Sequence, residues 1–147
     1  MSMFGAIDAA ASGLTAERLR MDVISNNIAN VNTTRTAEGG AYRRKVVVFE
    51  PRGEQVEPFS KVLEKESGGD PGNGVRAVGI TVDNAPLRTV YDPGHPDANQ
   101  AGYVEMPNVN IVSEMVDMIT ASRSYEANVT AVNAAKSMAM KTLEIGK

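Results

Sequence analysis

Apolar residues recur at helical spacing at both ends of the chain, whereas the residues that break helices are confined to its middle. All seven prolines lie between residues 51 and 107, and ten of the thirteen glycines lie between residues 39 and 102. Proline costs about 3 kcal/mol and glycine about 1 kcal/mol inside a helix. This segregation predicts two helical ends around a middle that is not helical.

The N-terminal end carries one apolar stripe at spacings of three, four and seven residues, which is the pattern of an amphipathic helix. Arg18 and Ser25 interrupt the stripe. The helix is expected to fail near residues 30–34, where asparagine and β-branched residues disfavour it. The members of the stripe are Phe4, Ile7, Ala11, Leu14, Met21 and Ile28.

The C-terminal end carries a longer stripe in the same three-four rhythm. Asn110 is placed to cap the start of this helix, and Gly146 is placed to end it. A helix of about 35 residues is roughly 50 Å long. Its stripe consists of Ile111, Met115, Met118, Ser122, Tyr125, Val129, Val132, Ala139 and Leu143, and Val112, Val116 and Ile119 widen it at the start.

The middle of the chain contains short runs of β-branched and aromatic residues separated by turn residues. Strands are predicted at 42–49, 75–82, 87–91 and 102–105, with loops at 67–74 and 92–97. The basic residues 43–45 at the start of the first strand have two interpretations. They contact an anionic partner, or they protect an edge strand against aggregation.

These elements predict an α+β fold with three segments. Residues 1–34 and 108–147 form one helical domain, in which the two helices pair in an antiparallel, coiled-coil-like manner, and residues 35–107 form a small, mainly β insert. Such an insert is too small to cover both helices, and a lone helix pair leaves apolar surface in water. The sequence therefore predicts a protein that assembles with neighbouring copies of itself.

Composition and charge narrow the classes of function. The net charge of −3 argues against nucleic-acid binding, which needs a basic face. The absence of cysteine excludes a thiol nucleophile and a cysteine-held zinc ion. No apolar run is long enough to span a membrane, so no membrane insertion is expected. The mildly apolar start is interrupted by Asp8 and is not preceded by positive charge, which argues against a cleaved signal peptide.

Candidate chemistry is sparse. The single histidine, His95, lies between Gly94 and Pro96 in a predicted turn, without an evident partner for general-base work. Glu114 and Asp117 are better explained as acids that complement a helix dipole than as metal ligands. We therefore expect no catalytic residue, no cofactor, no metal and no small-molecule substrate. Two alternatives stay open: a small soluble enzyme that uses His95, and a cytoplasmic adaptor made of a helix pair.

Two segments resemble the terminal signatures of bacterial flagellar rod, hook and related axial proteins. Residues 25–33, SNNIANVNT, are similar to the N-terminal signature. Residues 114–119, EMVDMI, followed by residues 123–128, RSYEAN, are similar to the C-terminal one. Both occur in the expected order. Within this family, the short middle fits a proximal rod protein better than a hook or distal rod protein, although another short axial protein is the alternative.

The resemblance implies a structural role rather than an enzymatic one. Family members form the rod that crosses the periplasm and transmits motor torque, and they leave the cell through the flagellar type III export apparatus without signal cleavage. The implied partners are other copies of the chain, proximal and distal rod proteins, and the protein at the junction of rod and MS ring. Their terminal helices pair into the inner layer of the tube, with the β module outside.

The apolar stripes and the two signature segments together give a predicted assembly interface. Its N-terminal residues are Phe4, Ile7, Leu14, Met21, Asn26, Asn27, Ile28, Asn30, Val31 and Asn32, and its C-terminal residues are Ile111, Met115, Met118, Ile119, Tyr125, Asn128, Val129, Val132 and Leu143.

Overall fold

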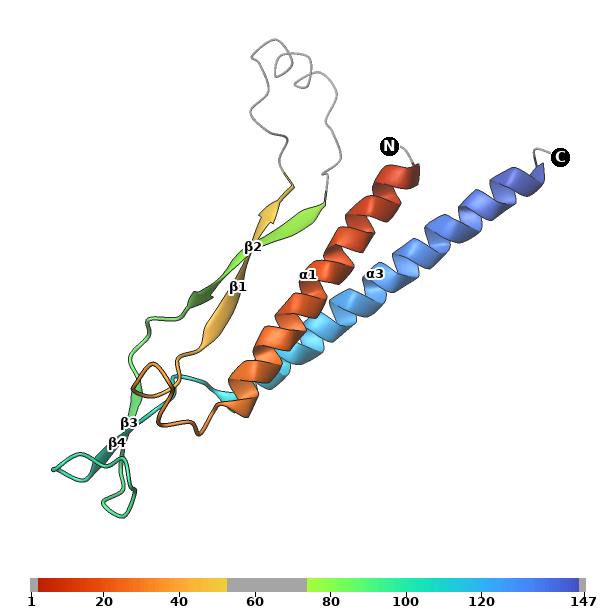
Figure 1. Ribbon diagram of the computed structural model, residues 1–147. Helices are drawn as coiled ribbons and strands as arrows, with labels where there is room; N and C mark the ends of the chain where they lie inside the picture. Colours follow the sequence, from red (N-terminus) through yellow and green to blue (C-terminus); the bar gives the residue numbers. More distant parts are fainter. Residues whose placement is uncertain (1–2, 53–73, 146–147) are drawn as a thin grey trace, which may run out of the picture. The chain divides into compact units, whose positions relative to one another are not determined.

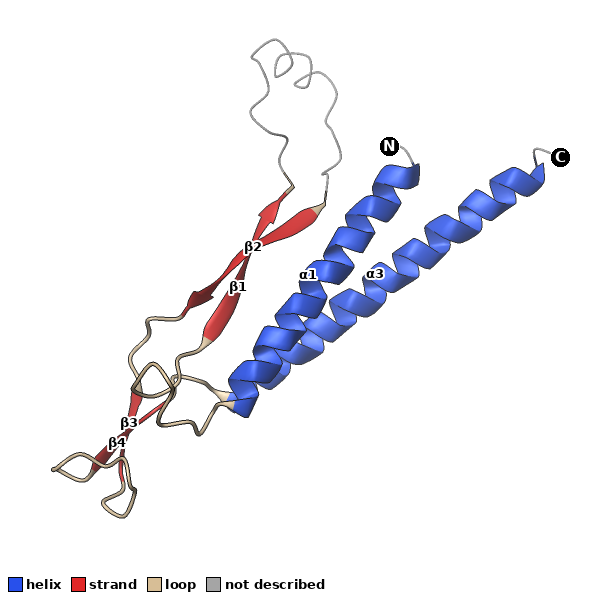
Figure 2. Ribbon diagram, in the orientation of Figure 1, coloured by secondary structure: helices blue, strands red, loops and turns tan. Residues whose placement is uncertain are grey.

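A computed structural model of the chain describes residues 3–52 and 74–145 (Figure 1). The elements, in order, are α1 (Met3–Ala29), β1 (Lys45–Pro51), β2 (Val75–Val82), β3 (Arg88–Tyr91), β4 (Tyr103–Met106) and α3 (Ile111–Ile145). In sequence order, two long helices therefore enclose the strands of two small sheets, which confirms the predicted α+β class (Figure 2). Neither of the described helices is apolar enough over its length to cross a membrane.

Local hydrogen bonds mark the end of α1 and the start of α3. In α1, the backbone N–H of Asn30 still reaches the carbonyl of Asn26, but the N–H of Val31 turns to Ile28, which tightens the last turn. In α3, the Asn110 carboxamide oxygen accepts hydrogen bonds from the N–H groups of Val112 at 3.0 Å and Ser113 at 3.4 Å. The predicted cap is therefore confirmed.

The four predicted strands are present and pair into two sheets of two strands each. Strands β3 and β4 are antiparallel, with Val90 opposite Val104 and Tyr91 opposite Tyr103. The two tyrosine rings meet edge to face, with centroids 5.2 Å apart. Strand β1 starts at Lys45, three residues later than predicted. Except for Gly74, the loop predicted at 67–74 lies outside the described residues, as does Gly146.

The chain divides into two compact units, each of which contains part of both helices. In the first unit (described residues 3–18, 49–52, 74–78 and 122–145), Ser12, Ala16 and Ala135 are buried. The core of the second unit (residues 19–48 and 79–121) consists of Val23, Ile24, Asn27, Ala41, Tyr42, Val104, Val109, Glu114 and Ala121. Four of the buried helix residues have small side chains that suit close helix packing: Ser12, Ala16, Ala121 and Ala135.

In the first unit, α1 and α3 approach each other closely at Gly13. A Cβ atom added at Gly13 would lie 2.8 Å from the Asn128 side-chain nitrogen. Nearby, the Ser12 hydroxyl donates to the Ala9 carbonyl and accepts from the N–H of Val75, which attaches the start of β2 to α1. Gly74 has a φ of +88°, and its added Cβ would clash with the Ser12 hydroxyl oxygen. Only glycine fits this conformation and this spacing.

We expect Gly13→Leu to lower the free energy of unfolding by about 1–3 kcal/mol, because the larger side chain forces the helices apart. Leucine is a good helix former, so lost helix propensity does not explain such a loss. Thermal unfolding followed by circular dichroism measures it. The matched control is Ala11→Leu, at an exposed position on the same helix. Equal stability of the two variants would contradict the close approach.

Candidate assembly site

A buried carboxamide joins three segments of the second unit. The side chain of Asn27 is 1% exposed. Its oxygen accepts hydrogen bonds from the Lys45 N–H at 2.9 Å and the Tyr42 hydroxyl at 3.0 Å. Its nitrogen donates to the Lys45 carbonyl at 2.9 Å and to Glu114 at 3.0 Å. The carboxamide thus pairs with the backbone of Lys45 as a neighbouring strand would, and every donor and acceptor is used.

Glu114 of α3 carries the charge at the centre of this cluster. Its side chain is fully buried, and one oxygen accepts a 2.6 Å hydrogen bond from Arg44 Nε. The Arg44 guanidinium also contacts Asp117 at 3.3 Å and Asp83 at 3.9 Å. Burial of an unpaired carboxylate costs several kcal/mol, so Glu114 depends on the charge of Arg44 and the amide of Asn27. We refer to Asn27, Tyr42, Arg44 and Glu114 as the polar cluster.

The position of Tyr42 in the polar cluster shifts the pKa of its hydroxyl. Burial raises the pKa of Tyr42 above 10.0, and the negative charge of Glu114 raises it further. Both causes act against the phenolate, because a low-dielectric site and a nearby anion each disfavour a second negative charge. The hydroxyl therefore stays protonated and donates to Asn27.

The surfaces available for contact with other molecules lie outside this core. The first three turns of α3 expose an apolar stripe that is 44–69% accessible: Ile111, Val112, Met115, Val116 and Ile119. Near its other end, α3 exposes Met138, Met140 and Leu143. Strands β1 and β2 also expose large apolar residues: Val46, Val48, Val78, Ile80 and Val82. Contiguous exposed apolar residues of this kind mark interaction surfaces.

The structure distributes the residues of the predicted interface over buried, half-buried and exposed positions. On the N-terminal side, Asn27 is buried, Asn26 and Asn32 are exposed, and the Phe4 side chain lies outside what the structure describes; Ile7, Leu14, Met21, Ile28, Asn30 and Val31 are half-buried. On the C-terminal side, Ile111, Met115, Ile119 and Leu143 are exposed, whereas Met118, Tyr125, Asn128, Val129 and Val132 are half-buried. Assignment of these residues to an interface between subunits stays a prediction.

Sequence reasoning missed the role of Glu114 and left that of Arg44 open. The sequence predicts Glu114 as an acid that complements the helix dipole, whereas in the structure it is the most deeply buried large side chain of the described residues. The anionic groups that Arg44 contacts are internal ones. The signal in the sequence was the combination of two acids in the first turns of the C-terminal helix, Glu114 and Asp117, with the basic residues 43–45 at the start of the first strand. The pattern does not specify which of them is buried.

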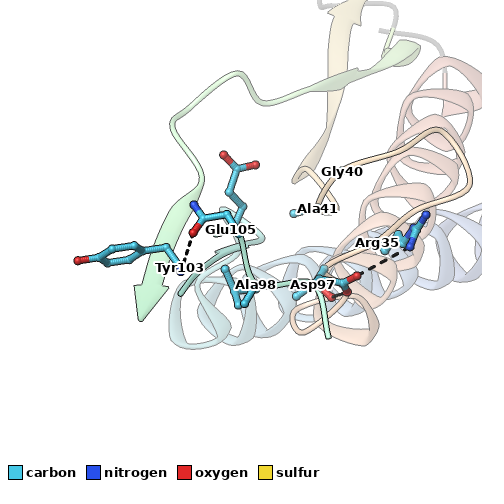
Figure 3. Close-up of a pocket in the computed structure, with 10 residues that line it drawn as sticks. Arg35, Gly40, Ala41, Asp97, Ala98, Tyr103 and Glu105 are labelled. Atoms are coloured by element: carbon cyan, nitrogen blue, oxygen red, sulfur yellow. Dashed lines mark hydrogen bonds and ion pairs between the residues drawn. The ribbon is translucent and has the colours of Figure 1, made fainter. Parts of the chain in front are cut away.

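A separate cavity of about 400 Å³ lies among the loops of the second unit (Figure 3). Asp97 links its walls, since its carboxylate accepts a 2.8 Å hydrogen bond from the Thr34 hydroxyl and forms an ion pair with Arg35 at 4.0 Å. His95 does not line this cavity. The Nδ1 atom of His95 accepts a hydrogen bond from the N–H of Asp97, which makes it a turn-stabilising residue. The described residues hold no cluster of metal-binding side chains.

Two family models match the chain, one at each end. The model described as "Flagella basal body rod protein" matches residues 7–35, and the model described as "Flagellar basal body rod FlgEFG protein C-terminal" matches residues 100–145. Both signature segments lie within these ranges. The matches define the class of protein, that of flagellar basal-body rod proteins.

Curated relatives match the chain from end to end. The flagellar basal-body rod protein FlgC of Borreliella burgdorferi is 50% identical over 149 residues, which cover 99% of the chain and 98% of the relative. FlgC of Bacillus subtilis is 50% identical over the full length of both chains, and FlgC of Escherichia coli O157:H7 is 40% identical over the full length of both. The chain belongs to the FlgC family of flagellar basal-body rod proteins. It is a structural component of the flagellar basal body.

Removal of the buried carboxylate tests the polar cluster. We expect Glu114→Ala to lower the free energy of unfolding by about 3–5 kcal/mol, because Arg44 and Asn27 lose their central acceptor. Chemical denaturation measures the loss. Glu126→Ala, at an exposed position of the same helix, is the matched control and is expected to change stability by less than about 0.5 kcal/mol. A loss of similar size in both variants would contradict the assigned role.

The raised pKa of Tyr42 predicts an alkaline effect with a definite sign. Below pH 10, Tyr42 is neutral in both the folded and the unfolded chain, and Tyr42→Phe lowers stability by about 1 kcal/mol through the lost hydrogen bond. As pH rises past 10.0, the unfolded chain releases this proton before the folded one does, so the wild type loses stability that the variant keeps. The difference in the free energy of unfolding between the wild type and Tyr42→Phe therefore becomes smaller above pH 10. Denaturation curves from pH 8 upward check this, and a constant difference would contradict it.

Proposed function

We propose that the chain is a subunit of the proximal rod and polymerises through its terminal helices into the shaft that transmits motor torque. The observation that carries this proposal is the apolar surface of α3. Five large apolar residues in its first three turns stay 44–69% exposed after the chain has folded. Water disfavours such a surface, and contact with adjacent subunits removes it from water.

The proposed interface keeps the residues of the two predicted stripes, with their exposed members in direct contact between subunits. Ile111, Met115, Ile119 and Leu143 are the exposed members on α3, and Asn26 and Asn32 are exposed at the end of α1. We also keep the division into one helical domain, 1–34 with 108–147, and a β-rich insert, 35–107, as part of the proposal. In this arrangement the helices form the inner layer and the insert lies outside.

Torque transmission needs a subunit that does not deform when its neighbours push on it. Close-packed protein interiors transmit strain, because they contain few voids and are hard to compress. The approach of α1 and α3 at Gly13 and the polar cluster at Glu114 both resist sliding of one helix along the other. These contacts support a role in torque transmission.

The finer statements on partners and location are proposals as well. We propose that the partners are further copies of the chain, other proximal and distal rod proteins, and the protein at the junction of rod and MS ring. We propose that the subunit lies in the periplasmic part of the basal body. It reaches this place through the flagellar type III export apparatus, without cleavage of a signal peptide.

A charge on the exposed stripe tests the assembly role without disturbing the fold. We expect Ile119→Asp to leave the unfolding curve of the purified protein unchanged and to abolish motility, because burial of an unpaired carboxylate in the interface costs several kcal/mol. Swimming in soft agar and electron microscopy of isolated basal bodies measure the effect.

His95→Ala serves as the control and separates the structural role from the enzymatic alternative. The structural role predicts normal swimming for this variant, since His95 stabilises only a turn. An enzyme that depends on His95 predicts the reverse pattern. Normal rods in the Ile119→Asp strain would overturn the proposed interface.

A further inference from the structure

A second cavity lies where the end of α1, the start of β3 and the start of α3 meet in the second unit. Its volume is about 420 Å³. Pro107 and Val109 are buried and, with Val31 and Ile111, form an apolar floor, while Asn108 and Asn110 alternate with these residues and add polar groups to the lining. Asn32 and Arg88 lie at its exposed rim. Three of the residues predicted to mediate assembly, Val31, Asn32 and Ile111, thus line one cavity.

The cavity carries a single cationic side chain, that of Arg88, which has no anionic partner among the described residues. No ion pair or hydrogen bond joins the Arg88 guanidinium to any residue in the described ranges 3–52 and 74–145. Among the other described arginines, Arg35, Arg44, Arg52 and Arg76 form ion pairs with carboxylates of the same chain, whereas Arg43 does not. An apolar floor beside an unpaired guanidinium fits an aliphatic side chain that lies next to a carboxylate.

The far end of α3 presents that chemistry. Leu143 is 76% exposed, and the next residue, Glu144, is exposed and unpaired within the described part of the chain. The last turn of α3 contains no basic residue, and the negative end of the helix dipole adds to the charge of Glu144. The charge and apolarity of this helix end therefore complement those of the cavity.

We propose that the cavity receives the last turn of the C-terminal helix of a neighbouring rod subunit, whose aliphatic side chain enters the floor and whose carboxylate pairs with Arg88. The proposal rests on the proposed assembly of the chain into a rod. The cavity adjoins the first residue of α3, whereas the complementary turn is at its last residues. The two surfaces differ, so the contact is heterologous and repeats from subunit to subunit without closing on itself.

Charge reversal at Arg88 is the first test. In cells that lack their own copy of the protein, we expect Arg88→Glu to reduce the number of complete rods about tenfold, which corresponds to loss of one interfacial ion pair. Arg88→Lys keeps the charge and is expected to retain most rods. Arg43→Glu reverses an exposed arginine that does not line this cavity, and it is expected to have no effect. Rods at wild-type number in the Arg88→Glu strain would overturn the proposal.

Cross-linking identifies the occupant. Because the chain contains no cysteine, Asn32→Cys provides one attachment point for a thiol-directed photo-crosslinker at the rim. In isolated basal bodies, we expect a cross-link to the last helical turn of an axial subunit, at an aliphatic residue beside an acidic one. Arg88→Glu in the same protein lowers its yield about tenfold. A cross-link to any other segment overturns the proposal, and so does a cross-link yield that Arg88→Glu leaves unchanged.

The two levels of the proposal fail in different ways. Basal bodies that do not contain the wild-type protein at all would refute the assembly role itself. Basal bodies that contain the Asn32→Cys protein without a cross-link to a helix end would refute the occupant of the cavity and leave the rod role standing.

Discussion

The ion pair between Arg44 and the buried Glu114 is the interaction on which the second unit depends. A carboxylate with no exposed surface is tolerated only where a cation and hydrogen-bond donors replace water, and Arg44 and Asn27 provide both. Because these three residues come from the start of the ribbon, from α1 and from α3, the pair fixes the mutual register of all three segments. An apolar core of similar size would bind them together without specifying one register.

The residue types on the surface differ from those in the core. The described core combines alanines, β-branched residues, Tyr42 and three polar side chains, whereas none of the described leucine and methionine side chains is buried and many large apolar ones are exposed. This inversion is unusual for a protein that stays monomeric, because exposed apolar area in water is not compensated within the chain. The exposed apolar surface is consistent with membership of the FlgC family, since a subunit of an assembled rod is surrounded by other subunits. Methionine suits such a surface, because its flexible side chain adapts to neighbours that are not identical.

The elements of the fold were predictable from the sequence, and the pairing of side chains was not. Periodicity, the Asn110 cap and the position of the prolines are local signals, and they located both helices and all four strands. The burial of Glu114 and the role of Asn27 depend on residues 87 positions apart, so no local pattern contains them. The sequence also predicts the stripe on α3 as one surface. It contains exposed residues such as Met115 and Ile119 and half-buried ones such as Met118 and Val132, because a wide apolar face serves both the fold and its surroundings.

The attachment of β2 to α1 through Ser12 has a consequence for how this fold accommodates change in length. The Arg52 N–H donates to the Gly74 carbonyl at 2.9 Å, so the ribbon is closed by its own backbone at this point. Ser12 holds the next residue, Val75, from the helix side. A segment inserted between Arg52 and Gly74 therefore begins and ends at hydrogen-bonded neighbours, so its length does not change the pairing of the strands at this point. The fold therefore has an insertion site at this position for peptide tags, reporter domains or evolutionary insertions, which leaves the contacts of the helices in place.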